Sequence, residues 1–245
     1  MDYSGRQFDV TPFQAALLAH NVDLWEKMEI YFGKLPDGQA EKARQFKEVF
    51  PNGMPAQKPY DFSKLVQVIT NSTPGDIQAA REKRPNNTPL WQALENFRNE
   101  FTALSMKEKY FNPQHLIEAF NVYAQQYSLW SWEQLILFWC QVIGYTQRFL
   151  PEPYVRILYQ GCEQVIFSLQ PSSGLGFDFG VYNLACGVDG GDGGGVTCMG
   201  TCRWCVDEER SVLKNFVEQI HQSFVGLSAS CCVLGRDSLG WYRCS

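Results

Sequence analysis

The sequence has only three histidines, no long apolar run and no strong charge of either sign. Its longest apolar stretch, residues 135–145, is interrupted by Gln141 and is far shorter than the roughly 20 residues that cross a bilayer, so we expect no stable membrane insertion. Residues 1–6 lead into mixed sequence without the apolar core of a secretory signal, which favours a cytoplasmic location. A net charge of −5 gives no general attraction to nucleic acid or anionic lipid.

The nine cysteines form an odd set, which does not favour a complete disulfide framework. Without an export signal, a reducing cytosolic setting fits this composition better. Cys140 and Cys162 lie inside apolar helical patterns, where thiols behave as small hydrophobic side chains.

Strict alternation of apolar and polar residues is scarce, so we predict no sheet and an all-α fold. Helix starts are marked by a capping residue followed by proline, which lacks the N–H that would stay unpaired there. Thr11-Pro12 and Thr88-Pro89 are examples. The pattern predicts helices over residues 12–19, 22–33, 40–49, 61–71, 74–84, 89–107, 113–128, 131–149, 152–169 and 207–224.

Three regions follow from composition and periodicity. Residues 8–110 are predicted to form degenerate helix pairs, and residues 111–170 a small helical bundle around a central helix over 131–149 that is apolar almost all round. Residues 171–245 are rich in glycine and cysteine, and glycine at such density carries a high entropic cost of ordering. We therefore predict a flexible tail with one short helix.

The strongest chemical motif is the C-x3-C-x2-C spacing of Cys198, Cys202 and Cys205. It resembles the motif that holds a [4Fe–4S] cluster in radical S-adenosylmethionine enzymes, which implies three thiolate ligands. The fold context does not fit, because only forty residues follow and no strands are predicted. A zinc site is less demanding, with a fourth ligand from Cys186, His221, Cys231 or Cys232. These cysteines are weak metal candidates, and we predict no bound cofactor.

Other patterns with catalytic potential are weaker still. The glycine run at 190–196 lacks the preceding strand and the following Gly-Lys of a phosphate-binding loop. His20 stands at the end of the first helix, where a C-capping role is favoured. A hydrolase that pairs His115 with Cys140 or Cys162 stays an alternative, since such pairs meet in space rather than in sequence. We predict no catalytic residues.

The segment 11–16, Thr-Pro-Phe-Gln-Ala-Ala, resembles the T-P-L-H-x-A signature of ankyrin repeats, and residues 63–80 and 88–94 resemble degenerate units. Together with residues 111–120 and 137–151, they resemble ankyrin-like proteins of intracellular bacteria. Many of these are suspected effectors delivered into host cells by a type IV secretion system. The resemblance covers roughly residues 8–170 and implies binding to a host protein, without catalytic residues to carry over.

The sequence therefore predicts a protein–protein interaction module with a protein partner of unknown identity and no nucleic-acid partner. We expect a cytoplasmic location, and the resemblance implies in addition that the protein is delivered into a host cell. The alternative belongs to a different class, a metalloprotein whose C-terminal cysteines bind zinc or an iron–sulfur cluster.

Overall fold

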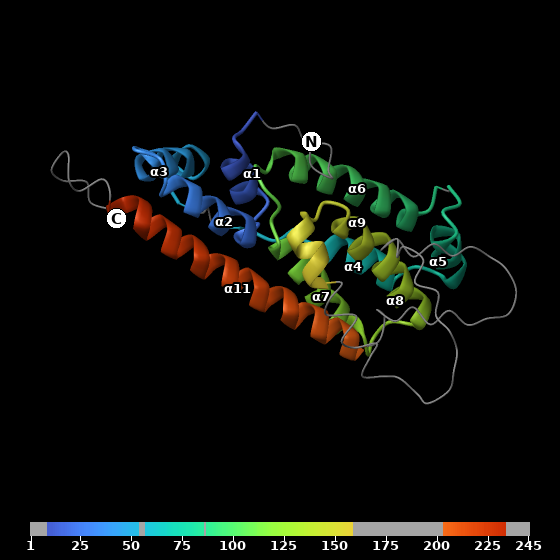
Figure 1. The fold of residues 1–245 in the computed structure, drawn as a ribbon. Coiled ribbons are helices and arrows are strands. Elements are labelled where there is room, and N and C mark those ends of the chain that lie inside the picture. The colour runs from blue at the N-terminus through green and yellow to red at the C-terminus, as the bar shows by residue number, and fades with distance from the viewer. Residues whose placement is uncertain (1–8, 54–56, 86, 159–202, 234–245) are drawn as a thin grey trace, which may run out of the picture.

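The computed structural model describes residues 9–53, 57–85, 87–158 and 203–233, and within them the chain is helical with no strand (Figure 1). An isolated bridge between Pro51 and Gly53 is the β-type pairing found there. The predicted all-α class is confirmed for this part of the chain.

The helices come close to the predicted positions over most of the chain. They are α1 Pro12–Leu18, α2 Val22–Phe32, α3 Gly38–Val49, α4 Ser63–Thr70, α5 Pro74–Arg81, α6 Pro89–Lys107, α7 Gln114–Gln126, α8 Trp132–Phe138, the π-helix η1 Trp139–Ile143, α9 Gly144–Gln147 and α11 Arg203–Val233. Residues 152–158 are also helical. Residues 159–169 of the last helix predicted for the bundle lie outside the described residues.

Local capping explains why the early helices start where predicted. Thr11 and Ser131 each form a capping box, in which the hydroxyl accepts the N–H three residues on, and Gln14 or Gln134 accepts the cap's own N–H. At α5 the Thr73 hydroxyl accepts the N–H of Asp76 in the same way, without the reciprocal bond of a capping box. These bonds depend on neighbours in sequence, which makes the helix starts readable without tertiary information.

The predicted central helix over 131–149 is interrupted by the π-helix η1. The Gln141 side chain lies buried in η1, where its Oε1 accepts a hydrogen bond from Nη2 of Arg98 at 2.5 Å. A π-helix widens the turn by one residue and re-aims the side chains around it. Trp132 at the start of α8 is half exposed, so this helix is not enclosed along its whole length.

The prediction of one short helix in the tail is wrong. α11 extends over 31 residues and packs against α7 and α3, along one side of the molecule (Figure 1). Its buried side chains recur every three to seven residues: Leu213, Ile220, Phe224 and Leu227. This spacing gives a continuous apolar stripe, which a helix must bury against a neighbour. The rest of the predicted tail, 171–202 and 234–245, lies outside the described residues.

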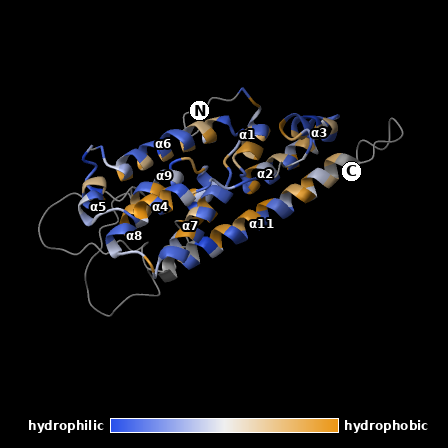
Figure 2. Cartoon of the chain, turned by 180° about the vertical axis from the view of Figure 1, so that it is seen from behind, coloured by the Kyte–Doolittle hydropathy of each residue, from blue (hydrophilic) through white to orange (hydrophobic). Residues whose placement is uncertain are grey.

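Hydrophobic and hydrophilic residues are mixed along α11, as Figure 2 shows. Among the helices in the described parts of the chain, none combines the length and apolarity needed to cross a bilayer.

One apolar core runs through all three predicted regions, from Phe13 in α1 to Leu227 in α11. α1 packs on both α2 and α3, whereas α4 packs mainly on α6, and α5 packs on α8 and α6. The structure does not confirm a regular stack of ankyrin-like pairs. It shows a helical assembly in which neighbouring helices pack together, while α5 on α8 and α11 on α7 and α3 join segments more distant in sequence.

Gly38 determines how closely α3 approaches the end of α2. A Cβ built at Gly38 would lie 1.7 Å from the Phe32 carbonyl oxygen, a separation that requires the backbone to move. We expect Gly38→Ala to lower the free energy of unfolding by roughly 3 kcal/mol in chemical denaturation. Gly33→Ala is the matched control, because its Cβ would lie 3.6 Å from the nearest atom. Equal effects of the two substitutions would contradict this account.

The Phe224 side chain packs α11 against the N-terminal helices. Its ring lies 4.9 Å from that of Trp25 and 5.0 Å from that of Phe50. We expect Phe224→Ala to cost about 3–4 kcal/mol of stability, because it leaves a cavity among these rings. Val225→Ala, at a side chain 53% exposed, should change stability by less than about 0.5 kcal/mol in the same thermal or urea titration. A small effect at both positions would show that α11 is not part of the core.

Candidate functional site

Two linkers between helices are joined by a side-chain hydrogen bond. Residues 57–62 precede α4, and residues 108–113 join α6 to α7. The buried amide of Asn112 donates to the Lys58 carbonyl oxygen at 2.7 Å, while its Oδ1 accepts the Gln114 N–H at 3.0 Å. The one side chain of Asn112 thus joins the two linkers and bonds to the first residue of α7.

His115 bonds to both linkers and orients the carboxylate of Glu108. Its Nδ1 accepts the backbone N–H of Tyr60 at 2.9 Å, so the ring proton is on Nε2. Nε2 then donates to Oε1 of Glu108 at 3.0 Å. The ring is buried and both nitrogens are engaged, so His115 positions Glu108 and has no nitrogen left to take a proton from a substrate.

A cleft of about 590 Å³ opens beside Glu108. Its lining includes Val49, Phe50, Pro51, Leu104, Glu108, Tyr110 and Asn112. Burial, reinforced by the nearby charge of Glu108, raises the pKa of Tyr110 to about 12, which keeps its hydroxyl protonated at neutral pH. Besides the carboxylate of Glu108 and the phenol of Tyr110, the lining includes Lys58 and Lys109, so the cleft presents hydrogen-bonding and charged groups of both signs beside its apolar walls.

His20 has the capping role that its position in the sequence predicts. Its φ of 55° places it in the left-handed region, and its N–H donates to the Leu17 carbonyl at 3.1 Å. The next N–H, of Asn21, donates to the Ala16 carbonyl at 2.9 Å. This pair of bonds is the Schellman motif that closes a helix C-terminus.

The His20 ring has a second role that the sequence did not indicate. Its Nδ1 lies 2.6 Å from the Tyr154 hydroxyl, and its ring lies 5.2 Å from Tyr110 and 5.8 Å from Phe224. Burial lowers the pKa of His20 to about 4 and raises the pKa of Tyr154, so both groups are neutral at pH 7. His20 is therefore a buried structural contact point rather than a ligand-binding group.

The structure does not test whether the weak metal candidates, Cys198, Cys202 and Cys205, lie close together. Cys198 and Cys202 lie outside the described residues, and only the backbone of Cys205, at the start of α11, is described. Elsewhere in the described ranges, no group of three or more His, Cys, Asp or Glu side chains could hold a metal ion. The metalloprotein alternative stays a prediction.

The structure does not assemble the alternative Cys–His hydrolase from Cys140. Cys140 lies in η1, while the two ring nitrogens of His115 bond to Tyr60 and Glu108. Cys162 and the glycine run at 190–196 lie outside the described residues.

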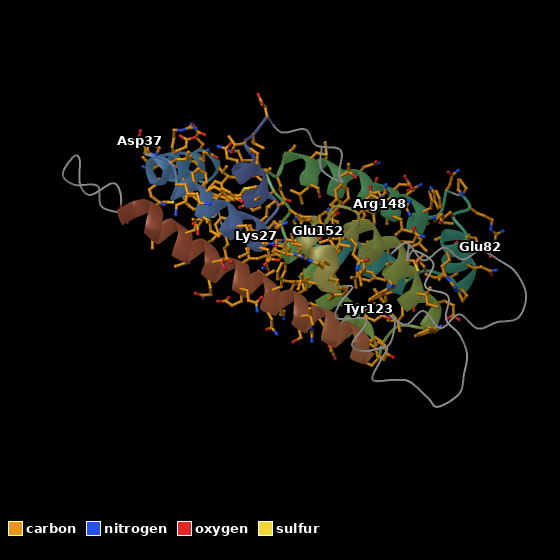
Figure 3. The ribbon with its side chains drawn as sticks, viewed as in Figure 1. Lys27, Asp37, Glu82, Tyr123, Arg148 and Glu152 are labelled. Atoms are coloured by element: carbon orange, nitrogen blue, oxygen red, sulfur yellow. The ribbon has the colours of Figure 1, made fainter. Side chains whose placement is uncertain are left out.

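An exposed apolar surface on α2 is the feature that sequence reasoning missed. We define the α2 surface as Leu24, Ile30, Tyr31 and Leu35, which are 40%, 63%, 66% and 56% exposed. Lys34 places its Nζ 5.0 Å from the centre of the Tyr31 ring. Figure 3 labels Lys27, which is also on α2, and Asp37, which lies just before α3. The sequence feature that could have predicted this surface is the apolar pairs Leu24-Trp25 and Tyr31-Phe32, which put apolar groups on both sides of one helix.

No family model matches the sequence, and searches of curated proteins and of solved structures give no match either. The resemblance to ankyrin-like proteins of intracellular bacteria therefore stays a prediction. The functional interpretation depends on the geometry of the chain itself.

The buried His20 predicts a specific pH dependence of stability. Because its pKa falls from 6.5 to about 4 on folding, the unfolded chain binds the proton more tightly between these values. The contribution of neutral His20 to the free energy of unfolding is fully present above pH 6.5. It decreases as the pH falls, by about 2 kcal/mol at pH 5. The free energy of unfolding is measured from pH 7.5 to pH 4.5, and its dependence on pH should be smaller in His20→Asn than in the wild type. Asparagine is chosen because it tolerates the positive φ at this position. The same slope in both proteins would contradict the assignment.

Proposed function

We propose that the protein acts by binding another protein molecule through the α2 surface. The observation that supports this function is the concentration of large exposed apolar side chains on one short helix and the turn that follows it. Scattered exposed apolar residues are ordinary, but contiguous ones, with a tyrosine among them, are typical of protein interfaces. The predicted location in the cytoplasm, or in a host cell after delivery, is compatible with this proposal and stays a prediction.

The opposite side of α2 is fixed to the core, which keeps the surface in place. Trp25 is buried against Phe224, and Phe32 packs edge-on to Phe13 with ring centres 5.0 Å apart. Because the helix is already ordered, a partner that binds its outer side does not have to order the backbone first.

An ion pair adds a polar link between α2 and α3. The buried Lys42 side chain places its Nζ 3.0 Å from Oε1 of Glu29. Glu29 is thereby directed towards α3 rather than towards the outer side of α2. The exposed charges that flank the apolar groups, Lys27 and Lys34 among them, are left to set the polar rim of the interface.

Site-specific photo-crosslinking tests the proposal. With p-benzoylphenylalanine in place of Tyr31, irradiation of cells that express the protein should give a discrete covalent adduct with a protein. The same adduct should form from position 30, because Ile30 is its exposed neighbour. Leu24→Glu should reduce the yield from position 31 at least about tenfold, since it places a charge in the apolar contact.

Met106 on α6 provides the control, because it is apolar and half exposed but lies away from the α2 surface. The adduct should be absent when the crosslinker stands at position 106. The absence of any discrete adduct at positions 30 and 31, or an identical pattern at position 106, would refute the proposed function.

A further inference from the structure

We propose that the partner of the α2 surface is a second copy of this chain, with the two α2 helices packed antiparallel about a twofold axis. This inference rests on the proposed function and names the partner of that same surface. A twofold interface must be complementary to itself, so it can be judged from one chain alone.

The exposed charges at the two ends of the α2 surface have opposite signs. Asp23 lies in the first turn of α2, and Lys34 follows its last turn. In an antiparallel pair, Asp23 faces Lys34 of the second copy, and the symmetry axis repeats this contact at the other end. The opposed helix dipoles favour the same orientation.

The register set by these end contacts also matches the middle of the helix. Facing residues in an antiparallel pair have a constant sum of residue numbers, so Lys27 lies opposite Ile30 and beside Tyr31 of the second copy. An ammonium group over a tyrosine ring is a favourable contact. Leu24 falls opposite the C-terminal end of α2 of the second copy, beside Tyr31, so the pairing buries these two apolar side chains against each other.

The charges already bonded within the chain do not oppose this arrangement. Glu29 lies at the symmetry axis, but it is directed towards Lys42 on α3. Asp23 lies 3.2 Å from Arg156, which also pairs with Glu152, and both of these contacts are exposed. Exposed ion pairs contribute little to stability, so Asp23 can exchange its partner at small cost.

The size of the contact predicts a weak dimer. One short helix with four apolar side chains buries less than the ~1,600 Å² of a standard interface. We therefore expect a dissociation constant of about 10⁻⁵ M rather than a permanent dimer.

Sedimentation velocity of the full chain from about 1 to about 200 µM tests the inference. The wild-type protein should shift from monomer to dimer across this range. Asp23→Lys and Lys34→Glu should each weaken self-association at least about tenfold, because each opposes like charges at both ends of the interface. An equimolar mixture of the two variants should recover dimers, since every end contact between the two different chains pairs opposite charges.

Leu129→Glu is the control, because this side chain is 74% exposed but lies in the turn between α7 and α8. It should dimerise as the wild type does. A wild-type chain that stays monomeric, or a mixture no tighter than the separate variants, would overturn the inference. A monomeric chain whose Tyr31 position still crosslinks to a different protein would refute the second copy as partner and leave the proposed function standing.

Discussion

The buried ring of His20 joins four segments that are distant in the sequence, and the arrangement of the helices depends on it. The backbone at His20 ends α1 in the left-handed region, while its ring contacts Tyr110, Tyr154 and Phe224. These three residues belong to the linker between α6 and α7, to the helical residues 152–158 and to α11. The neutral imidazole bonds to the Tyr154 hydroxyl through Nδ1, while its Nε2 is buried without a hydrogen-bond partner, which disfavours a protonated ring at this position.

The inner side of α2 packs into the core, and its outer side carries the surface that we propose for binding. Trp25 packs on Phe224 from the inner side, and the absence of a side chain at Gly38 lets α3 close against the end of the helix. The inner side is thus fully used by the core. The apolar side chains on the outer side do not contribute to that core, which is the reason to attribute them to binding.

The sequence predicts those parts of the fold that depend on neighbouring residues. The capping boxes at Thr11 and Ser131 and the Schellman role of His20 are local, and all three were readable. The full extent of α11 was not, because the density of glycine in the region predicted a flexible tail with one short helix, although Leu227 continues the buried stripe of α11.

Contacts across long sequence separations account for what the sequence did not predict. Gln141 in the π-helix accepts a hydrogen bond from Arg98, which lies 43 residues away. The burial of His20 depends on Tyr154, 134 residues away. The α2 surface was missed for a related reason, since periodicity cannot tell which of two apolar sides a helix will bury.

We infer that α11 forms one cooperative unit with α7, on which it packs, and with α1, since His20 at the C-terminal end of α1 contacts Phe224. Native-state hydrogen exchange tests this most directly, because it reports the free energy of opening for each segment. The account predicts that amides of residues 213–227 exchange with the same opening free energy as those of α7, and that both equal the global stability. Exchange of α11 at least about 100-fold faster than that of α7 would contradict it, because α11 would then be a separable addition to the fold.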